Sequence, residues 1–508
     1  MEATLDSLAL GFSVAFRPDV LLYAFLGCLV GTLVGMLPGI GPLAGISILL
    51  PVTFGLDATK AIVMLAGIYY GSQYGGSTTS ILMRIPGEAA SVMTCIDGHA
   101  MAKKGRAGAA LCIAAVGSFV AGTFGVILLT VVAPPLANFA LRFGPPEYTA
   151  LLIVGLVFLA YMSTTSLART LLMACVGLLL GCIGIDVMTG HFRYSFDIKE
   201  LGDGIGIVPV AVGLFGLGEI LSTPAKTVTS EVVRPRFAEL LPNRTEWRQS
   251  AMPIARGSVL GFLVGIVPGS AHIISSFLSY ALEKRISRTP EAFGNGAVAG
   301  VAGPEAANNA ASTGAFVPML ALGLPTGPVT AVLMAALLIH GVPPGPTLVT
   351  DHPQVFWGFI ASMYVGNLML LALNLPLVGL FVSVLRIPYA YLYPLIIMFC
   401  IIGVYEVNHS IVDVWIMLIM GGVGYGLRKL DFDPAPLVLG LVIAPVFELS
   451  LRQSLVMSNG NWLIFFQRPI AGTLMAIALL LLVLGLKPLL SRSADWRRKL
   501  GVDGEPGR

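Results

Sequence analysis

The sequence is poor in charged residues. Only 11% of its 508 residues are Asp, Glu, Lys or Arg, whereas a soluble globular protein carries about 25%. This shortage excludes a soluble enzyme, a disordered scaffold and a nucleic-acid binder. The net charge of +3 adds little, because the placement of charge in a membrane protein matters more than its sum.

Motifs for catalysis, metal binding and nucleotide binding are also missing. The six cysteines form no CxxC pair and the six histidines show no HExxH spacing, so we expect neither a disulfide framework nor a resident metal. No GxSxG or Walker motif occurs, and we expect no catalytic residues and no cofactor. Because no ATP-binding loop is present, an ion gradient has to supply the energy for any transport.

Apolar segments fill the chain instead. Hydrophobic residues make up 56% of the sequence, and the apolar stretches leave room for roughly a dozen helices of about 20 residues each. The 59 glycines and 33 prolines suit membrane helices, whose neighbours re-satisfy the backbone groups that these residues free. We therefore predict an all-α polytopic protein of the inner (cytoplasmic) membrane, with about 12 transmembrane segments.

Lys and Arg concentrate in a few segments, which the positive-inside rule assigns to the cytoplasm. The longest of them, 223–256, divides the chain into two halves. We predict five units, which are a first transmembrane repeat (1–222), a cytoplasmic linker (223–256), a second transmembrane repeat (257–427), C-terminal transmembrane segments (428–490) and a cytoplasmic basic tail (491–508).

The two halves share a glycine–proline motif. GCLVGTLVGMLPG begins at Gly27 and GSVLGFLVGIVPG begins at Gly257, an offset of 230 residues. A single GxxxG is weak support for any function, but two copies of GxxxGxxxGxxPG indicate a duplication. A second pair, GGSTTSILMRIPG from Gly75 and GAFVPMLALGLPTG from Gly314, follows at an offset of 239.

Equivalent loops of the two halves carry opposite charge signals. The first Pro-Gly segment leads to FGLDATK, with one Lys, and its counterpart leads to the basic EKRISR. The Pro86 segment leads to the basic DGHAMAKKGR, whereas the Pro325 segment leads to the uncharged HGVPPGPTL. Such opposition is typical of the inverted repeats of secondary transporters.

The positive-inside rule also predicts how the Pro-Gly segments lie in the membrane. Because 223–256 and the KRISR loop are both basic, we predict that 257–283 is a re-entrant hairpin that returns to the cytoplasmic face. By inversion, 19–54 would enter from the periplasm. The number of re-entrant or broken helices stays open.

The Pro-Gly turns are the first candidate substrate- or ion-binding residues. Proline breaks the helical ladder and glycine allows the chain to turn, so that free N–H groups can hold a carboxylate and free carbonyls can coordinate sodium. Helix kinking and close glycine packing are the alternatives. The residues are Gly35, Pro38, Gly39, Gly265, Pro268 and Gly269.

Two polar clusters complete the candidate site. Hydroxyl oxygens can bind Na⁺ or the polar edge of a carboxylate. Alternatively, the hydroxyl groups bond the backbone carbonyl four residues earlier. Adjacent amide side chains in an apolar region need several hydrogen-bond partners. The cluster residues are Ser77, Thr78, Thr79, Asn308, Asn309, Ser312 and Thr313. Arg84 either pairs with an anionic substrate or snorkels to the interface, and Glu305 either binds an ion or proton or is solvated at a helix end.

The motifs GTLVGMLPGIGP, YYGSQYGGSTTSILMRIPGEAASVMTCIDGHAMAKKGRAG and GLPTGPVTAVLMAALLIHGVPPGP closely resemble the large membrane subunit of the tripartite tricarboxylate transporter family. The likeness extends from about residue 20 to 485. It implies a bacterial inner-membrane symporter for carboxylates such as citrate, coupled to Na⁺ or H⁺, in which a transiently bound Na⁺ would be the sole metal. The implied partners are a small transmembrane subunit and a periplasmic solute-binding protein. An importer of dicarboxylates or aromatic acids with the same architecture, and a membrane-embedded enzyme, stay open as alternatives.

Overall fold

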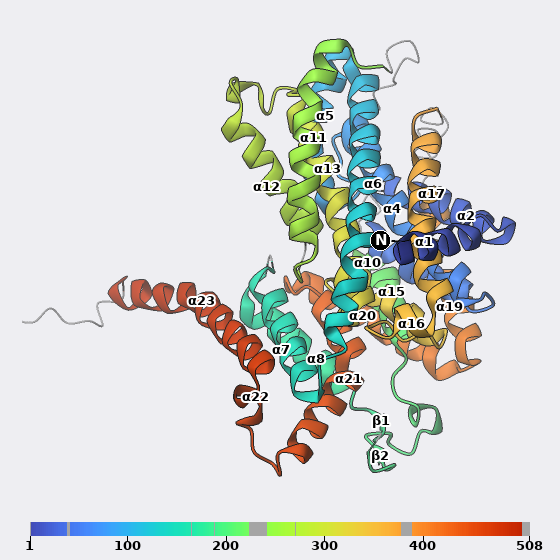
Figure 1. Ribbon diagram of the computed structural model, residues 1–508, viewed down its shortest axis with the longest axis vertical. Helices are drawn as coiled ribbons and strands as arrows, with labels where there is room; N and C mark the ends of the chain where they lie inside the picture. The colour runs from blue at the N-terminus through green and yellow to red at the C-terminus, as the bar shows by residue number, and fades with distance from the viewer. Residues whose placement is uncertain are drawn as a thin grey trace, which may run out of the picture.

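The computed structural model describes residues 2–37, 41–163, 165–186, 188–222, 241–269, 271–376 and 389–499. The regular secondary structure of these ranges is helical except for one short hairpin, in which β1 (Gly184–Ile185) pairs antiparallel with β2 (Phe192–Arg193). Figure 1 shows long helices side by side, with this hairpin projecting at the lower end. The prediction of an all-helical protein is confirmed.

The first half contains fifteen described helical elements. They are α1 (Glu2–Ala15), α2 (Pro18–Met36), α3 (Gly41–Leu49), η1 (Leu50–Thr53), α4 (Ala58–Met83), η2 (Ala89–Ser91), α5 (Val92–Met101), η3 (Ala102–Arg106), α6 (Ala107–Ala140), α7 (Pro145–Tyr161), α8 (Leu167–Leu180), η4 (Lys199–Leu201), α9 (Ile207–Ala211), η5 (Val212–Leu217) and α10 (Gly218–Ser222).

The rest of the chain continues with helices of mixed length. They are α11 (Arg244–Gly265), α12 (Ala271–Ile286), η7 (Pro290–Ala292), α13 (Ala299–Gly314), α14 (Phe316–Leu322), α15 (Pro328–Ile339), α16 (Leu348–Asp351), α17 (Pro353–Asn374), α19 (Tyr389–Asn408), α20 (Ile411–Lys429), α21 (Ala435–Met457), α22 (Ile464–Gln467) and α23 (Pro469–Lys499).

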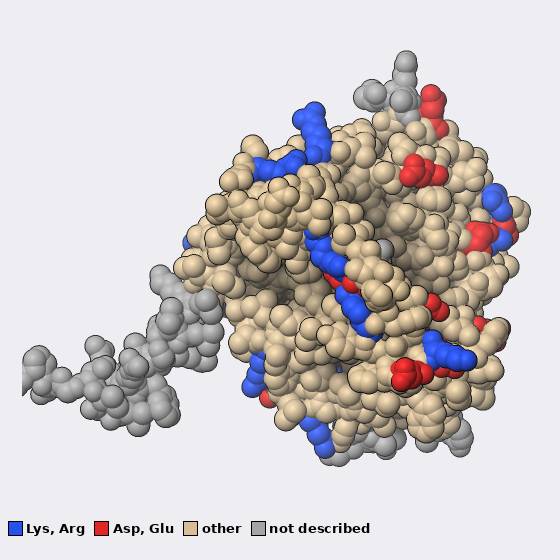
Figure 2. Space-filling view, turned by 90° about the horizontal axis from the view of Figure 1, so that it is seen from below, with Lys and Arg blue, Asp and Glu red and all other residues tan. Residues whose placement is uncertain are grey.

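Five helices of the described chain are long and apolar enough to cross a membrane. They are α2, the run from η2 to α6, α17, α20 and α21. Shorter apolar helices accompany them, because several apolar segments of the sequence are divided at proline or glycine. The apolar stretch 293–342, for example, forms α13, α14 and α15. Viewed from below, most of the surface is neither acidic nor basic, and the charged residues gather in small groups (Figure 2). The chain is therefore a multi-pass membrane protein.

Helix α11 begins inside the polar stretch that we predicted to be a linker. The Asn243 side chain accepts a hydrogen bond from the Glu246 N–H over 2.9 Å, and the Glu246 carboxylate accepts one from the Asn243 N–H over 2.7 Å. This reciprocal pair is a capping box, which satisfies two N–H groups at the start of a helix. Residues 244–256 are consequently helical, and 223–240 lie outside the described residues.

Helices α11 and α12 form an antiparallel hairpin. Near its open end Arg256 of α11 binds Glu283 of α12 through two hydrogen bonds of 2.8 and 2.6 Å. The turn contains Gly269, whose φ of +142° is a conformation that L side chains rarely adopt. Arg106, which follows α5, pairs with Glu246 at the start of α11 over 2.9 Å. Basic segments that we predicted to be cytoplasmic thus lie together, and the re-entrant placement of the hairpin stays a prediction.

Both glycine motifs are helix contacts. A Cβ atom added to any of six glycines would lie 2.5 Å or less from a carbonyl oxygen of α4 in the first half or of α13 in the second. Backbone atoms cannot give way as a flexible side chain can, so glycine is required for this approach. The pairs are Gly27 with Met64, Gly31 with Ile68, Gly35 with Ser72, Gly257 with Gly303, Gly261 with Ala307, and Gly265 with Ala311.

The apolar core surrounds the places where the two halves meet. Phe316 of α14 is fully buried and stands edge-on to Tyr69 and Tyr70 of α4, with ring centroids 6.0 Å away in both cases. Phe359 of α17 packs on the same ring at 5.0 Å. Edge-to-face aromatic pairs at these separations are favourable, and they hold α4, α14 and α17 together around the candidate site.

Candidate functional site

Helix α4 is a long buried helix with a polar sequence. Its 26 residues correspond to about 39 Å, and Asp57 caps its start by accepting a hydrogen bond from the Lys60 N–H over 3.0 Å. The segment GSQYGGSTTS makes it too polar for a lipid-facing span, and α2, α6 and α17 pack against it instead. Polar side chains are thereby enclosed within the protein.

The predicted hydroxyl cluster lies along this helix. Ser77 and Thr78 each donate to the carbonyl four residues earlier, over 2.9 and 3.2 Å, which is the local bonding that the sequence left open. Thr79 donates to the carbonyl of Met36, at the end of α2, over 3.0 Å. Ser77 also lies 2.6 Å from the carboxylate of Glu305 on α13, so the cluster reaches the second half.

The predicted polar residues of α13 meet side chains of the first half. Asn308 donates to Glu88 over 2.8 Å, Asn309 donates to Ser118 over 2.7 Å, and Ser312 accepts from Gln73. Thr313 instead donates to the Asn309 carbonyl over 3.1 Å and packs against Gly125 of α6. Three of the four predicted α13 residues therefore hydrogen-bond side chains of the first half.

Three hydroxyl groups contact the Glu305 carboxylate, and Ser77 shares its single hydrogen between this carboxylate and the Gln73 carbonyl. Ser77 and Ser118 lie 2.6 and 3.5 Å from its Oε2 atom, and Thr94 of α5 binds its Oε1 atom. Asn309 donates to Ser118, which leaves the Ser118 hydrogen free to point at the carboxylate. Glu305 is 1% exposed, so its place is in the interior rather than at a solvated helix end.

The Pro268–Gly269 turn has different neighbours. The Gly269 N–H donates to the carbonyl of Thr326 over 2.6 Å, and a Cβ atom at Gly269 would lie 2.9 Å from the Cβ atom of Met162. The two Pro-Gly segments of the second half thus touch each other. The corresponding first-half turn, Pro38–Gly39, lies outside the described residues.

Helices α4 and α14 end in the same conformation. Arg84 caps α4 with φ 60° and ψ 26°, and Gly323 caps α14 with φ 66° and ψ 28°. Their positions differ by 239 residues, and a proline follows two residues later in both. We call residues 84–88 the first break and 323–327 the second break. A left-handed conformation costs a residue with a Cβ atom about 1–2 kcal/mol, which Gly323 avoids and Arg84 does not.

The chain restarts after the two breaks through the same contact. The Glu88 N–H donates to Ser91 Oγ over 3.4 Å, and the Gly327 N–H donates to Thr330 Oγ1 over 2.9 Å. Each hydroxyl donates in turn to the carbonyl of the residue that it caps, over 2.8 and 2.9 Å. The backbone is therefore alike in both breaks, whereas Arg84 and Glu88 replace two glycines.

Two small cavities adjoin the polar residues. Ser77, Thr78 and Ser118 are among the residues that line the first, and Asn309 and Thr313 are among those that line the second. Each cavity has a volume of about 10 Å³. That is about the space needed by one water molecule. A carboxylate substrate would therefore need the surrounding helices to move apart.

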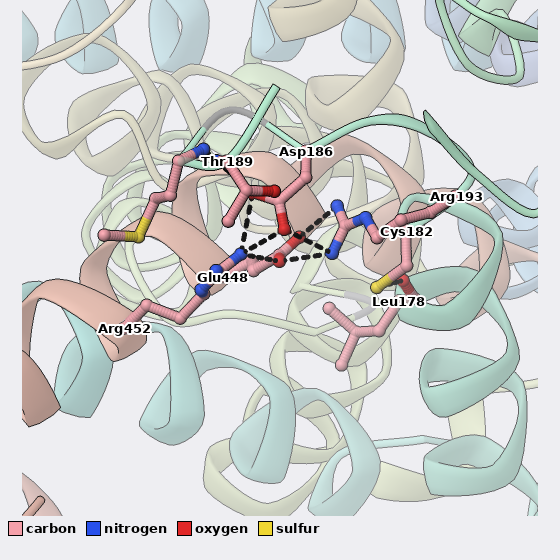
Figure 3. A network of polar contacts seen from close by, with 8 residues as sticks. Leu178, Cys182, Asp186, Thr189, Arg193, Glu448 and Arg452 are labelled. Carbon is pink, nitrogen blue, oxygen red and sulfur yellow. Dashed lines mark hydrogen bonds and ion pairs between the residues drawn. The ribbon is translucent and has the colours of Figure 1, made fainter. Parts of the chain in front are cut away.

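A larger cavity lies beside the β hairpin. It measures about 450 Å³ and is bordered by a charged network (Figure 3). Arg193 of β2 binds both carboxylate oxygens of Glu448 over 2.6 and 3.0 Å. Arg452 binds Glu448 over 2.9 Å and Asp186 over 2.7 Å. With Asp203 also in its wall, the cavity has three carboxylates against two guanidinium groups, which disfavours an anionic substrate.

This network anchors the loop that contains the hairpin. The hydrogen bond from Arg452, helped by the N–H groups of Met188 and Thr189, holds the pKa of Asp186 well below its usual range. Asp186 therefore stays ionised at neutral pH, and its contribution to stability is lost only as the pH falls below the ordinary range of an aspartate. We interpret this cavity as a structural feature, and the polar residues between α4 and α13 as the candidate site.

Buried hydroxyl, amide and carboxyl groups between broken helices are typical of membrane transport proteins. Polar residues inside a membrane protein mark substrate and ion pathways, and broken helices with binding sites between them are typical of secondary transporters. The chain belongs to the tripartite tricarboxylate transporter TctA family, which it matches over residues 21–439. The resemblance seen in the motifs is thereby confirmed, and the family is one of transporters and not of enzymes.

Two relatives come from Agrobacterium vitis. An uncharacterized 52.8 kDa protein in the TAR-I ttuC′ 3′ region is 46% identical over 495 residues, which cover 97% of this chain and 99% of the relative. An uncharacterized protein in the TAR-II ttuC′ 3′ region is 45% identical over 235 residues, which cover 46% of this chain and 97% of the relative. No solved structure matches the chain.

Sequence reasoning missed four residues of the site. They are Gln73, Glu88, Thr94 and Ser118, each of which bonds a predicted residue or Glu305. Gln73 precedes Ser77 by one helical turn, and this spacing could have joined it to the hydroxyl cluster. Glu88 follows directly after Pro86–Gly87, where a charged residue in an otherwise apolar motif was a usable signal. Thr94 and Ser118 offer no comparable pattern.

Proposed function

We propose that this chain is the large transmembrane subunit of a secondary importer in the bacterial inner membrane. In this proposal an ion gradient drives uptake, a periplasmic solute-binding protein delivers the substrate, and a small transmembrane subunit completes the complex. The substrates are tricarboxylates such as citrate, or related carboxylates. Membership of the TctA family supports the assignment.

One observation carries the proposal. The polar side chains of α4 and α13, which come from different halves of the chain, bond each other in the protein interior beside two breaks in helices. Desolvated polar groups are costly unless they are paired. A transporter uses such pairs because they can open and re-form as substrate and ion pass.

Arg84 is the proposed contact for a substrate carboxylate. Its side chain is exposed, and it forms no ion pair with any residue that the structure describes. A guanidinium group matches a carboxylate with two parallel hydrogen bonds. Because Glu88 and Glu305 repel anions, we place the substrate on the Arg84 side of the first break and the coupling cation on the carboxyl side.

We further propose that the two halves are inverted repeats related by a two-fold axis. Gln73 and Ser312, which hydrogen-bond each other, are 239 residues apart, the same offset as Arg84 and Gly323. A contact between equivalent positions is what such an axis produces where it passes between the halves. Inverted repeats arrange a shared binding site near the middle of the membrane and support alternating access to it.

Uptake of radiolabelled citrate into right-side-out membrane vesicles tests the assignment. Vesicles with this chain, the small subunit and the binding protein should accumulate citrate under an imposed ion gradient without ATP. Vesicles that lack the chain or the binding protein are the controls and should not. Unlabelled dicarboxylates and aromatic acids, added as competitors, define the substrate class. Full uptake by this chain alone, or uptake that needs ATP, would contradict the proposal.

A further inference from the structure

Glu88 and Asn308 join the first break to α13 inside the protein. Asn308 Nδ2 donates to Glu88 Oε1 over 2.8 Å, and the two residues are 6% and 1% exposed. Across the described ranges, no Lys, Arg or His pairs with Glu88. A carboxyl group buried without a countercharge has to be neutralised in another way.

The second oxygen of each side chain has no donor. Glu88 Oε2 and Asn308 Oδ1 are both buried, and neither has a hydrogen-bond partner among the residues that the structure describes. Both atoms are acceptors while the carboxyl group is ionised, so neither can satisfy the other. A proton on Oε2 supplies the missing donor, because a carboxylic acid can donate to an amide oxygen and accept from the same amide's nitrogen.

Glu305 shows the opposite arrangement. Hydroxyl groups surround its two oxygens, and hydrogen bonds of this kind favour the ionised carboxylate. Glu88 instead meets one amide donor on one oxygen and none on the other. Two carboxyl groups in one site with opposite hydrogen-bond surroundings take different roles in proton chemistry. Glu305 is also buried without a cationic partner among the described residues, but its hydroxyl neighbours favour the ionised form more than the neighbours of Glu88 do. Glu88 is therefore the residue better suited to gain and lose a proton.

The groups that face Glu88 do not supply a cation in place of a proton. Glu305 of α13 and Tyr69 of α4 are near enough to interact with it electrostatically. Helix α12 packs against η2 through Ser276, which donates to the carbonyl of Ala90 over 2.8 Å. The same helix contains His272, one turn earlier. Arg84, at the other end of the first break, is exposed rather than buried with Glu88.

We propose that Glu88 carries the coupling proton of transport and holds it against Asn308. The inference rests on the proposed function. With the proton bound, two hydrogen bonds join the first break to α13. Without it, one bond is left beside an uncompensated negative charge. The protonated state therefore favours the arrangement in which the halves are in contact, and release of the proton favours their separation, as a ligand that binds one state better shifts the population towards it.

Infrared spectroscopy of the purified chain tests the protonated carboxyl group without any transport. The wild-type protein at neutral pH in sodium-free buffer should show a buried carboxylic acid band, and Glu88→Gln should lack it. The glutamine side chain can still donate to Asn308 Oδ1 and accept from its nitrogen, so this variant should fold. Glu305→Gln is the matched control and should keep the band. Absence of the band in the wild type, or its persistence in Glu88→Gln, would overturn the proposal.

Citrate uptake with separate gradients tests the coupling. A pH gradient should stimulate uptake by the wild-type complex, and Glu88→Gln should lose that stimulation. Gln73 Oε1 is another buried oxygen without a hydrogen-bond partner, so a sodium site is the competing outcome. Loss of the acid band on adding NaCl, together with uptake driven by a sodium gradient alone, would overturn the proton proposal and leave the importer intact. No citrate uptake under any gradient, with the acid band present, would count against the importer and not against the protonated Glu88.

Discussion

The first and second breaks have similar backbone conformations but different side chains at their ends. Both begin with a residue in the left-handed conformation and contain a proline, and after both the next helix is capped by a hydroxyl group. The second break uses Gly323 and Gly327 at its ends, whereas the first uses Arg84 and Glu88. Because the backbone is the same, the two charged residues are not needed to form a break.

The two breaks also differ in backbone strain. Glycine is the residue of lowest strain in the left-handed conformation, so Arg84 retains a local cost of about 1–2 kcal/mol. Strained residues of this kind cluster at functional sites, where the surrounding structure holds them in place. In our proposal the first break provides charge for substrate and ion, whereas the second break has a similar backbone without charge.

The largest effect is expected where both halves need glycine. Gly31→Leu and Gly261→Leu each place a side chain against backbone, with the Cβ atom 2.5 Å or less from the carbonyl oxygens of Ile68 and Ala307. We expect both to destabilise the protein by about 3 kcal/mol or more, measured as loss of folded, monodisperse protein in detergent. Gly422→Leu is the control, because nothing lies within 4 Å of its Cβ position. Tolerance of the change in one half only would show that the two helix contacts are not equivalent.

Arg84→Gly separates strain from function. Glycine removes the free-energy cost of the left-handed backbone conformation, so the free energy of unfolding should rise by about 1 kcal/mol. Citrate uptake should fall about tenfold or more, because a charge-assisted hydrogen bond is lost.

Two variants sharpen this comparison. Arg84→Lys keeps a positive charge and should retain part of the uptake. Gly323→Ala should be destabilised, because its φ is +66° and its Cβ atom would lie 2.6 Å from the carbonyl of Pro344. Full activity of Arg84→Gly would identify Arg84 as an interfacial residue that snorkels.

The smallest effects are expected at the two caps. Ser91→Ala and Thr330→Ala each remove one hydroxyl from a helix start, so each should lower the stability by about 1 kcal/mol. Ser91 also accepts a hydrogen bond from Ser80 over 2.8 Å, so Ser91→Ala should lower the stability slightly more than Thr330→Ala. Thermal unfolding in detergent measures both, with the exposed Ser13→Ala as the control. A large loss of stability at one cap and none at the other would show that the two breaks are not equivalent.

Part of the site was predictable because its cause is local. The spacing GxxxGxxxG places glycines on one helix face, and both copies indeed face the backbone of another helix. Asn308 and Asn309 were predicted to need partners, since buried amides rarely stay unpaired. Asn308 and Asn309 both have side-chain donors in use, with Glu88 and Ser118 as acceptors.

Other parts were not predictable because their cause is distant in the chain. Glu88 and Asn308 are 220 residues apart, and Thr94 and Glu305 are 211 apart. No periodicity connects such positions. The polar stretch 244–256 was predicted to be part of a linker, because its charge resembles that of a loop. Its capping box starts α11 at Arg244, and the stretch is therefore helical.

The sequence by itself determined the membrane class, the two copies of the glycine motif and the turn at Pro268–Gly269. These follow from composition, from repeated motifs and from proline and glycine, which act on the residues next to them. Only the tertiary structure decided that Arg84 stands where the other half has glycine in the same left-handed conformation, and that Glu88 lacks the donors that Glu305 has. The physical reason is that hydrogen-bond partners are supplied by packing, and the packing of α4 against α13 joins segments that are remote in the chain.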